Sequence, residues 1–100
     1  MNPELVLPAE LTIYNAAELR VQLLAHAETH AQQESCRIDA AAVDQVDAAG
    51  LQLLLALART LGAAGRTLQL APVSPVLEAA VDALGLRAVL LGAAVEGAAA

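Results

Sequence analysis

Aspartate and histidine are the residues of this chain whose spacing could support metal chemistry. Asp39, Asp44 and Asp47 lie close together in sequence, and three carboxylates gathered at one end of a sheet could bind Mg²⁺. The chain has no lysine and no phosphate-accepting Asp pattern to match them, so we do not favour a phospho-receiver. His26 and His30 have the four-residue spacing of a shared metal site, but no third ligand is evident. We therefore predict no metal site.

Nucleophilic side chains are also few. Cys36 is the only cysteine, belongs to the apolar face of a predicted strand, and cannot form an internal disulfide. The chain lacks G-x-x-x-x-G-K-[ST] and G-x-G-x-x-G loops, a G-x-S-x-G elbow and a catalytic Cys/His pair. The hydroxyls of Ser74 and Thr12 could be modified, but a helix cap and a strand position explain them more simply. We expect neither an enzyme nor a bound cofactor.

The amino-acid composition limits the class of molecule that the chain can bind. With 100 residues, of which 58% are hydrophobic, the chain can build one aliphatic core. Tyr14 is the only aromatic residue, so the chain has no stacking platform for nucleic acid bases. The net charge of −6 and the scattered arginines oppose binding to phosphate backbones or anionic lipid. We expect a protein partner rather than nucleic acid or a membrane.

Sequence segments also suggest the domain limits and the compartment. The start of the chain has neither the basic region nor the apolar run of a signal peptide, and no apolar stretch reaches the ~20 residues that cross a bilayer. The cytoplasm is therefore the expected compartment. We predict one domain over residues 1–91, followed by a disordered Ala/Gly tail over residues 92–100.

Alternation of polar and apolar residues predicts the strands. Short strands are expected at residues 5–7 and 10–13, joined by a turn, and a third at 36–40. A later strand alternates Leu68 and Leu70 with polar residues, and a last extended segment is expected at 88–91. Polar residues on one strand face indicate that helices cover mainly the other face. The predicted fold is α/β, with a small mixed sheet and three to four helices packed mainly on one face.

Helical periodicity and caps predict three helices. Asn15 is the expected cap of a helix over 16–31, which should bury one apolar stripe. A second helix should begin near Asp47 and run to about residue 63, and Ser74 with Pro75 should start a third that ends at Gly85. The expected core stripes are Ala16, Leu19, Leu23 and Ala27; Leu51, Leu54, Leu55, Ala58 and Leu61; and Val76, Leu77, Ala80, Val81 and Leu84. Leu53 and Leu57 widen the apolar arc of the second helix, so this helix is either deeply packed or meets a partner at its edge.

A family resemblance rests on residues 46–51, which read Val-Asp-Ala-Ala-Gly-Leu and lead from a strand into an apolar helix. This segment resembles the STAS family of sulfate-transporter and anti-sigma-factor-antagonist domains. Similar residues occur at the expected places in 10–13, 17–20 and 84–86. The resemblance implies a STAS-like fold over most of the chain.

The resemblance also implies a function. In phosphorylated STAS domains a Ser or Thr precedes the motif glycine, and here that position is Ala49, so no phosphorylation is expected there. We predict a non-catalytic regulator, similar to an anti-sigma factor antagonist, that binds an ATP-using kinase or anti-sigma partner through this loop and the following helix. Asp47 would fix the loop and Gly50 would permit close approach. The predicted partner-binding residues are Gln45, Asp47, Ala48, Ala49, Gly50, Gln52 and Leu53.

Two alternatives remain open. The chain is also similar to the STAS subunit of bacterial phospholipid-trafficking ABC transporters, which braces a transport ATPase and needs no phosphorylation. A third hypothesis is a sensor that binds a nucleotide or small anion at the helix start near Asp47, although the charge of Asp47 argues against it. The wide apolar arc of the second helix also allows self-association.

Overall fold

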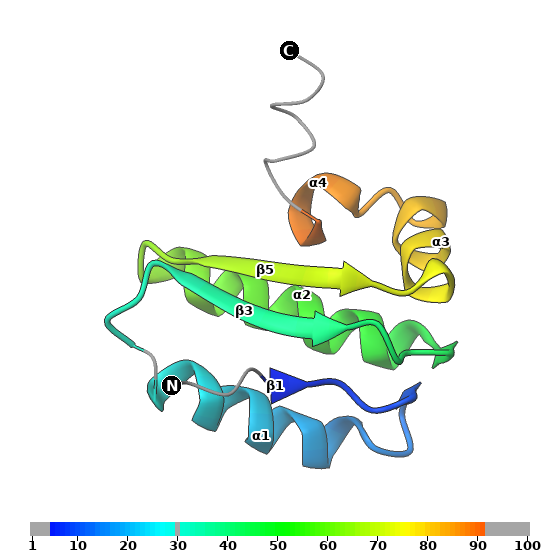
Figure 1. Ribbon diagram of the computed structural model, residues 1–100, viewed down its shortest axis with the longest axis horizontal. Coiled ribbons are helices and arrows are strands. Elements are labelled where there is room, and N and C mark those ends of the chain that lie inside the picture. Colours follow the sequence, from blue (N-terminus) through cyan, green and yellow to red (C-terminus); the bar gives the residue numbers. More distant parts are fainter. Residues whose placement is uncertain (1–4, 30, 92–100) are drawn as a thin grey trace.

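The computed structural model describes residues 5–29 and 31–91, which form two small sheets and four helices (Figure 1). The predicted tail over 92–100 and His30 lie outside the described residues. In chain order the elements are β1 (Leu5–Val6), β2 (Glu10–Leu11), α1 (Ala16–Thr29), β3 (Ser35–Ala40), β4 (Gln45–Val46), α2 (Ala48–Ala63), β5 (Thr67–Val73), α3 (Pro75–Ala83) and α4 (Arg87–Leu90).

The strands pair in parallel in both sheets. One sheet has the order β1-β3-β5, and the other pairs β2 with β4. Ile38 of β3 lies opposite Leu5 on one side and Leu70 on the other. The α/β fold class is confirmed, but the described pairings are all parallel where a mixed sheet was predicted. The reason is that a helix lies between the two strands of every pair in the chain. The helix carries the chain back to the end of the sheet where the first strand began, so the second strand runs in the same direction.

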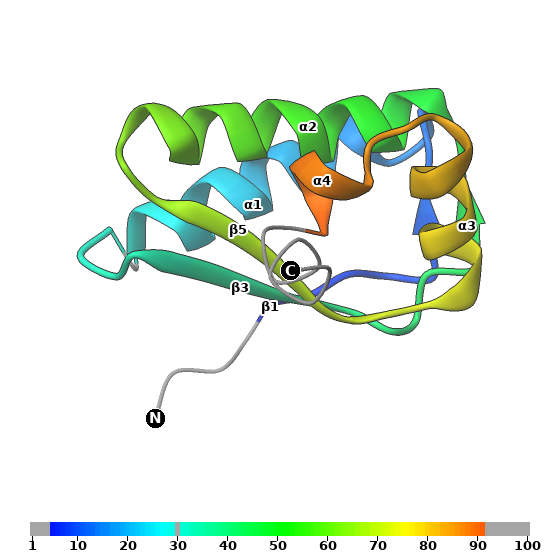
Figure 2. The same ribbon diagram turned by 90° about the horizontal axis from the view of Figure 1, so that it is seen from above.

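Helices cover one face of the three-stranded sheet. Cys36, Ile38 and Ala40 of β3 point into the core, whereas Arg37 of β3 and Gln69 of β5 are exposed. Figure 2 shows α1 and α2 lying along the same side of this sheet. The predicted one-sided arrangement is therefore confirmed, and it follows from the alternation of apolar and polar residues along the strands.

The predicted stripes of α1 and α2 largely agree with the structure. Leu19, Leu23 and Ala27 of α1 are buried as predicted. In α2, the apolar arc widened by Leu53 and Leu57 was expected either to be deeply packed or to meet a partner. Leu57 is only 3% exposed and Leu53 is half-buried against the core, so this side of the helix is packed within the domain. Both residues are covered for one reason, because α1 packs alongside α2 and covers the side of the helix that a single stripe would leave open.

The C-terminal part of the domain differs most from the prediction. Ser74 caps α3 as expected, because its Oγ accepts the Leu77 N–H at 3.1 Å. Val76 and Leu84, predicted to be buried, are exposed. The expected strand at 88–91 is instead the short helix α4, whose Leu90 is fully buried.

A helical turn explains this last difference. Leu86 and Leu90 are four residues apart, so a helix turns both toward the core, where Leu90 is buried and Leu86 packs against the buried cluster. This part of the chain also packs against α2, α3 and β5. Within residues 5–29 and 31–91, no helix is long and apolar enough to cross a membrane.

Candidate functional site

Asp47 joins the start of α2 to the loop that follows β2. As the N-cap of α2, its Oδ1 accepts the Gly50 N–H at 3.0 Å, while its Oδ2 accepts the Ile13 N–H at 3.0 Å. Its own backbone N–H donates to the Leu11 carbonyl oxygen at 3.2 Å. The predicted cap is therefore present, and the same carboxylate also ties down a loop 34 residues earlier in the chain.

These hydrogen bonds set the charge state of Asp47. The N–H of Gly50 contributes most and that of Ile13 next, and together they hold the pKa of the Asp47 carboxyl below its ordinary value. The carboxylate is ionised at neutral pH and lies at the positive end of the α2 dipole. Since the carboxylate already accepts these helix-end and loop donors, the arrangement disfavours an anion at the same place.

Gly50 is where β2 and the start of α2 lie close together. A Cβ built on this glycine would lie 2.1 Å from the Leu11 carbonyl oxygen and 2.8 Å from Leu11 Cγ. Gly50 was predicted to allow a partner to approach closely. The close approach found in the structure is made by the domain's own β2, and Gly50 is buried. Its role within the fold is to let β2 and the start of α2 pack together.

The other predicted contact residues differ in exposure. Gln45, Ala48 and Gln52 are exposed, and Ala49 is half-buried. Leu53 is also half-buried and lines a small cleft between α1 and α2 with Arg20 and Leu24.

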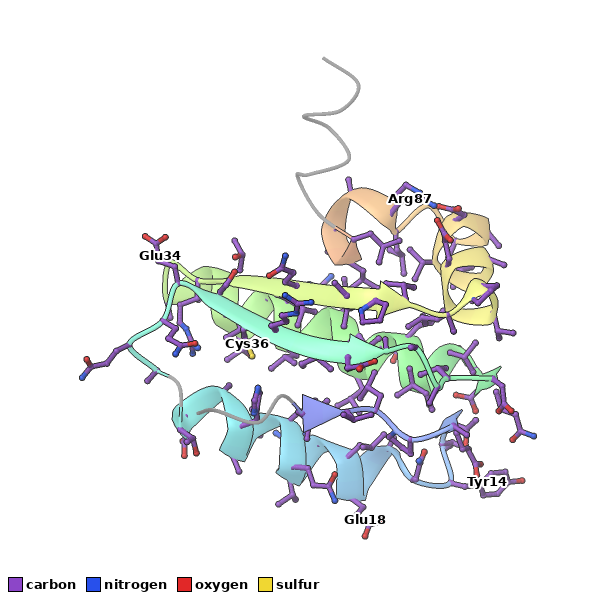
Figure 3. The ribbon with its side chains drawn as sticks, viewed as in Figure 1. Tyr14, Glu18, Glu34, Cys36 and Arg87 are labelled. Atoms are coloured by element: carbon purple, nitrogen blue, oxygen red, sulfur yellow. The ribbon has the colours of Figure 1, made fainter. Side chains whose placement is uncertain are left out.

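Two exposed hydrophobic side chains lie next to the start of α2 and were missed by the sequence reasoning. Tyr14 is 89% exposed and Ile13 is 67% exposed. The Ile13 N–H bond to Asp47 fixes their loop beside α2, and Figure 3 shows Tyr14 projecting from that end of the molecule. We call the exposed surface made by Ile13, Tyr14, Ala48, Ala49 and Gln52 the docking face.

The loop that carries Ile13 and Tyr14 is held by its own polar groups. Asn15 Oδ1 accepts the Thr12 N–H at 3.0 Å, and Asn15 Nδ2 donates to the Glu10 carbonyl oxygen at 2.6 Å. The side chain of Asn15 therefore stabilises the loop before α1 rather than acting as the cap predicted for that helix. Ile13 had been assigned to a strand, but β2 ends at Leu11, so the loop turns its side chain outward. The sequence did hold one signal for this exposed pair, because Tyr14 is the only Phe, Trp or Tyr of the chain and lies within a turn.

The remaining candidate groups are engaged elsewhere. Thr12 Oγ1 donates to Glu10 Oε2 at 2.6 Å and accepts from the Tyr14 N–H, and Thr12 is buried. Ser74 is 4% exposed and caps α3. Cys36 is buried, and Asp39 Oδ1 accepts the Ala41 N–H at 2.9 Å. Among the residues that the structure describes, no three His, Cys, Asp or Glu side chains are grouped as metal ligands.

Comparison with known proteins agrees with this architecture. No curated protein matches the chain. A family model described as "Mlab, STAS domain" matches residues 2–92, which is nearly the whole chain. That span includes both sheets, all four helices and the loop with its Asp47 cap. The chain therefore belongs to the STAS domain family.

Proposed function

We propose that this STAS domain is a non-catalytic regulator that binds an ATP-using protein of the kinase or anti-sigma type through its docking face. The observation that carries the proposal is an exposed apolar pair, Ile13 and Tyr14, fixed beside the start of α2 by a hydrogen bond to the Asp47 carboxylate. Because the proposed partner uses ATP, we also propose that the domain works in the cytoplasm.

A protein fits this face better than a small molecule does. Tyr14 offers its ring to solvent at the end of the domain, and exposed aromatic side chains of this kind often supply much of an interface's binding energy. Ala48 and Gln52 extend the face along the first turns of α2 without bulky obstruction. The neighbouring charges are acidic, since Glu10 and Asp44 belong to the adjoining segments, which favours a partner with a basic rim.

The docking face is built as a rigid platform. The Asp47 carboxylate holds both the loop and the helix start, and the packing of Gly50 on Leu11 fixes the distance between them. Little conformational freedom is therefore lost in this region on binding, which favours affinity.

Ala49 makes the proposed binding constitutive. The resemblance to phosphorylated STAS domains puts the modified hydroxyl at this position, and alanine cannot accept a phosphate. A phosphate there would add nearly two negative charges and three acceptor oxygens next to the docking face. Without it, the complex must be controlled by partner abundance or by another input.

A second candidate is an adaptor that braces a transport ATPase, as in phospholipid-trafficking ABC transporters. Two observations favour it: the family model carries the description "Mlab, STAS domain", and Ala49 leaves nothing to phosphorylate. The nucleotide or small-anion sensor is not proposed, because Asp47 already fills the anion position at the start of α2. Self-association is not proposed either, since Leu57, part of the apolar arc that suggested it, is buried.

The test is a pull-down from an extract of the source cells with the partner identified by mass spectrometry. A kinase or anti-sigma factor would support the first candidate, and a transport ATPase would support the second. Tyr14→Ala should reduce affinity for the recovered partner about 30-fold, as expected for the loss of an aromatic anchor worth about 2 kcal/mol. Ala49→Asp should weaken the same complex by placing an unpaired carboxylate beside the face.

Val6→Ala is the matched control, because Val6 is 57% exposed on the three-stranded sheet, outside the docking face. It should bind like the wild type. If the Tyr14 and Ala49 variants bind as well as this control does, the docking face is not the interface.

A further inference from the structure

The strand β5 leaves one of its edges open. It is the last strand in the order β1-β3-β5, so only one of its sides pairs with β3. The Thr67 N–H donates to the Glu34 carbonyl oxygen at 2.8 Å, which directs the backbone groups of Thr67 toward β3. Because these groups alternate along a strand, those of Leu68 and Leu70 point to the open edge.

The open edge is unoccupied within residues 5–29 and 31–91. There, no turn, loop or helix backbone exchanges a hydrogen bond with Leu68 or Leu70. The regular alternation ends at Leu70, because the pairing register between β3 and β5 shifts beyond the Ile38–Leu70 pair. The edge therefore offers the backbone donors and acceptors of Leu68 and Leu70, a stretch of about three residues or roughly 10 Å at about 3.3 Å per residue.

A groove runs beside this edge. It has a volume of about 620 Å³ and is formed by the C-terminal half of α2, by β5 and by α4. Figure 2 shows α4 beside β5 on the side where α2 lies. Apolar side chains line much of the groove, among them Ala58, Leu70, Val89 and Leu91, and Val89 is 49% exposed. Side chains that alternate along an added strand would have apolar contacts here.

The groove also carries a positive charge. Arg59 lines it and is the only charged residue of α2, a helix that contains no Asp or Glu. Arg66 lines the same groove. This is a local exception on a chain whose net charge is −6. An occupant with a carboxylate near one end would therefore be attracted here.

We propose that the open edge of β5 binds an extended, acidic peptide segment of a protein as an added strand. The backbone of Leu68 and Leu70 would pair with the peptide, the apolar wall would contact alternate side chains, and Arg59 would pair with a peptide carboxylate. This site is separate from the docking face and does not depend on the proposed function. A second copy of this chain fits less well, because β5 contains no acidic residue to pair with Arg59.

The probe is a synthetic peptide with the sequence Glu-Val-Thr-Val-Thr-Val-Glu, capped at both ends and labelled with fluorescein. Glutamate at each end allows either strand direction, and a peptide with lysine at both ends is its control. Fluorescence anisotropy with the full chain should show the lysine peptide binding at least about tenfold more weakly, a difference that shrinks in high salt. Equal binding of the two peptides, or binding of neither, would overturn the proposal.

Amide hydrogen exchange tests whether the peptide really adds a strand. In the free protein, the amides of Leu68 and Leu70 should exchange faster than those of Gln69 and Ala71, which face β3. The glutamate peptide should slow the exchange of Leu68 and Leu70 selectively. Binding without this selective protection would mean that the groove holds side chains only, and strand addition would be wrong.

Matched variants locate the peptide. Arg59→Glu should weaken binding of the glutamate peptide about tenfold, whereas Arg20→Glu, on α1 and outside the groove, should not. Val89→Asp should weaken it, and Val21→Asp, at a similarly exposed site on α1, should have no effect. Tyr14→Ala should also leave peptide binding unchanged, so that failure of this site and failure of the docking face can be told apart.

Self-pairing has its own signature. Sedimentation at rising protein concentration should show no dimer that protects the Leu68 and Leu70 amides in the absence of peptide. Such a dimer would assign the edge to a second copy of the chain and would overturn the proposal.

Discussion

Replacing Gly50 with alanine tests the packing that builds the candidate site. The added methyl carbon would lie 2.1 Å from the Leu11 carbonyl oxygen and 2.7 Å from the Leu11 carbonyl carbon, far inside van der Waals contact. The obstacle is backbone, so it cannot rotate away. The same oxygen accepts the Asp47 N–H, which means that moving β2 aside also strains that hydrogen bond.

The magnitude follows from three contributions. Overpacking of this kind costs roughly 1–3 kcal/mol. A strained backbone hydrogen bond adds about 1 kcal/mol. The better helix propensity of alanine stabilises the folded state by at most about 1 kcal/mol. Gly50→Ala should therefore lower the free energy of unfolding by roughly 1–3 kcal/mol.

Gly62→Ala is the matched control in the same helix. A Cβ at Gly62 would have nothing within 4 Å, so this variant should gain about 0.5–1 kcal/mol. Urea unfolding followed by circular dichroism should then separate the two variants by about 1.5–4 kcal/mol, and their melting temperatures by at least about 6 °C. If Gly50→Ala is as stable as Gly62→Ala, β2 does not pack on α2 as described.

Three further predictions concern single groups. Folding lowers the pKa of Asp47, so its ionised form stabilises the domain at pH values above the ordinary carboxyl pKa near 3.9, and this contribution is lost as the pH falls through the folded-state pKa. In urea titrations, the difference in unfolding free energy between the wild type and Asp47→Asn should therefore be larger at pH 7 than at pH 3. An equal difference at the two pH values would refute this prediction. Ser74→Ala should lower the free energy of unfolding by about 1 kcal/mol and the melting temperature by about 4–8 °C, whereas Ser35→Ala, at an exposed strand start, should change neither. Equal melting temperatures of the two variants would contradict the cap. Cys36 is buried, and burial raises the pKa of its thiol, so a thiol reagent should label the native protein only as fast as the domain unfolds locally around β3. Rapid labelling without urea would show that β3 is not covered.

Local signals in the sequence predicted much of the fold. The alternation in β3, the stripe of α1 and the Ser74–Pro75 start of α3 depend on residues close together in the chain, so these features can be seen in one segment at a time. The Asp47 cap was predictable for the same reason, since its bond to the Gly50 N–H spans three residues.

Only part of the proposed docking face could be predicted from the sequence. Ala48 and Gln52 are exposed as partner contacts should be, but Ile13 and Tyr14 were not included. Their position depends on the hydrogen bond from the Ile13 N–H to Asp47 Oδ2, across 34 residues of sequence. No pattern within either segment specifies that contact.

The sequence by itself determined the α/β class, the strand faces, the starts of α1, α2 and α3, and the absence of a hydroxyl at position 49. These depend on periodicity, on capping and on residue identity. Tertiary structure alone decided that Leu57 is buried, that α4 replaces a strand, that the strands pair in parallel, and that the close approach at Gly50 is made by Leu11. These depend on which distant segments pack together, because the free energy of burial comes from contacts among elements rather than from the preferences of one element.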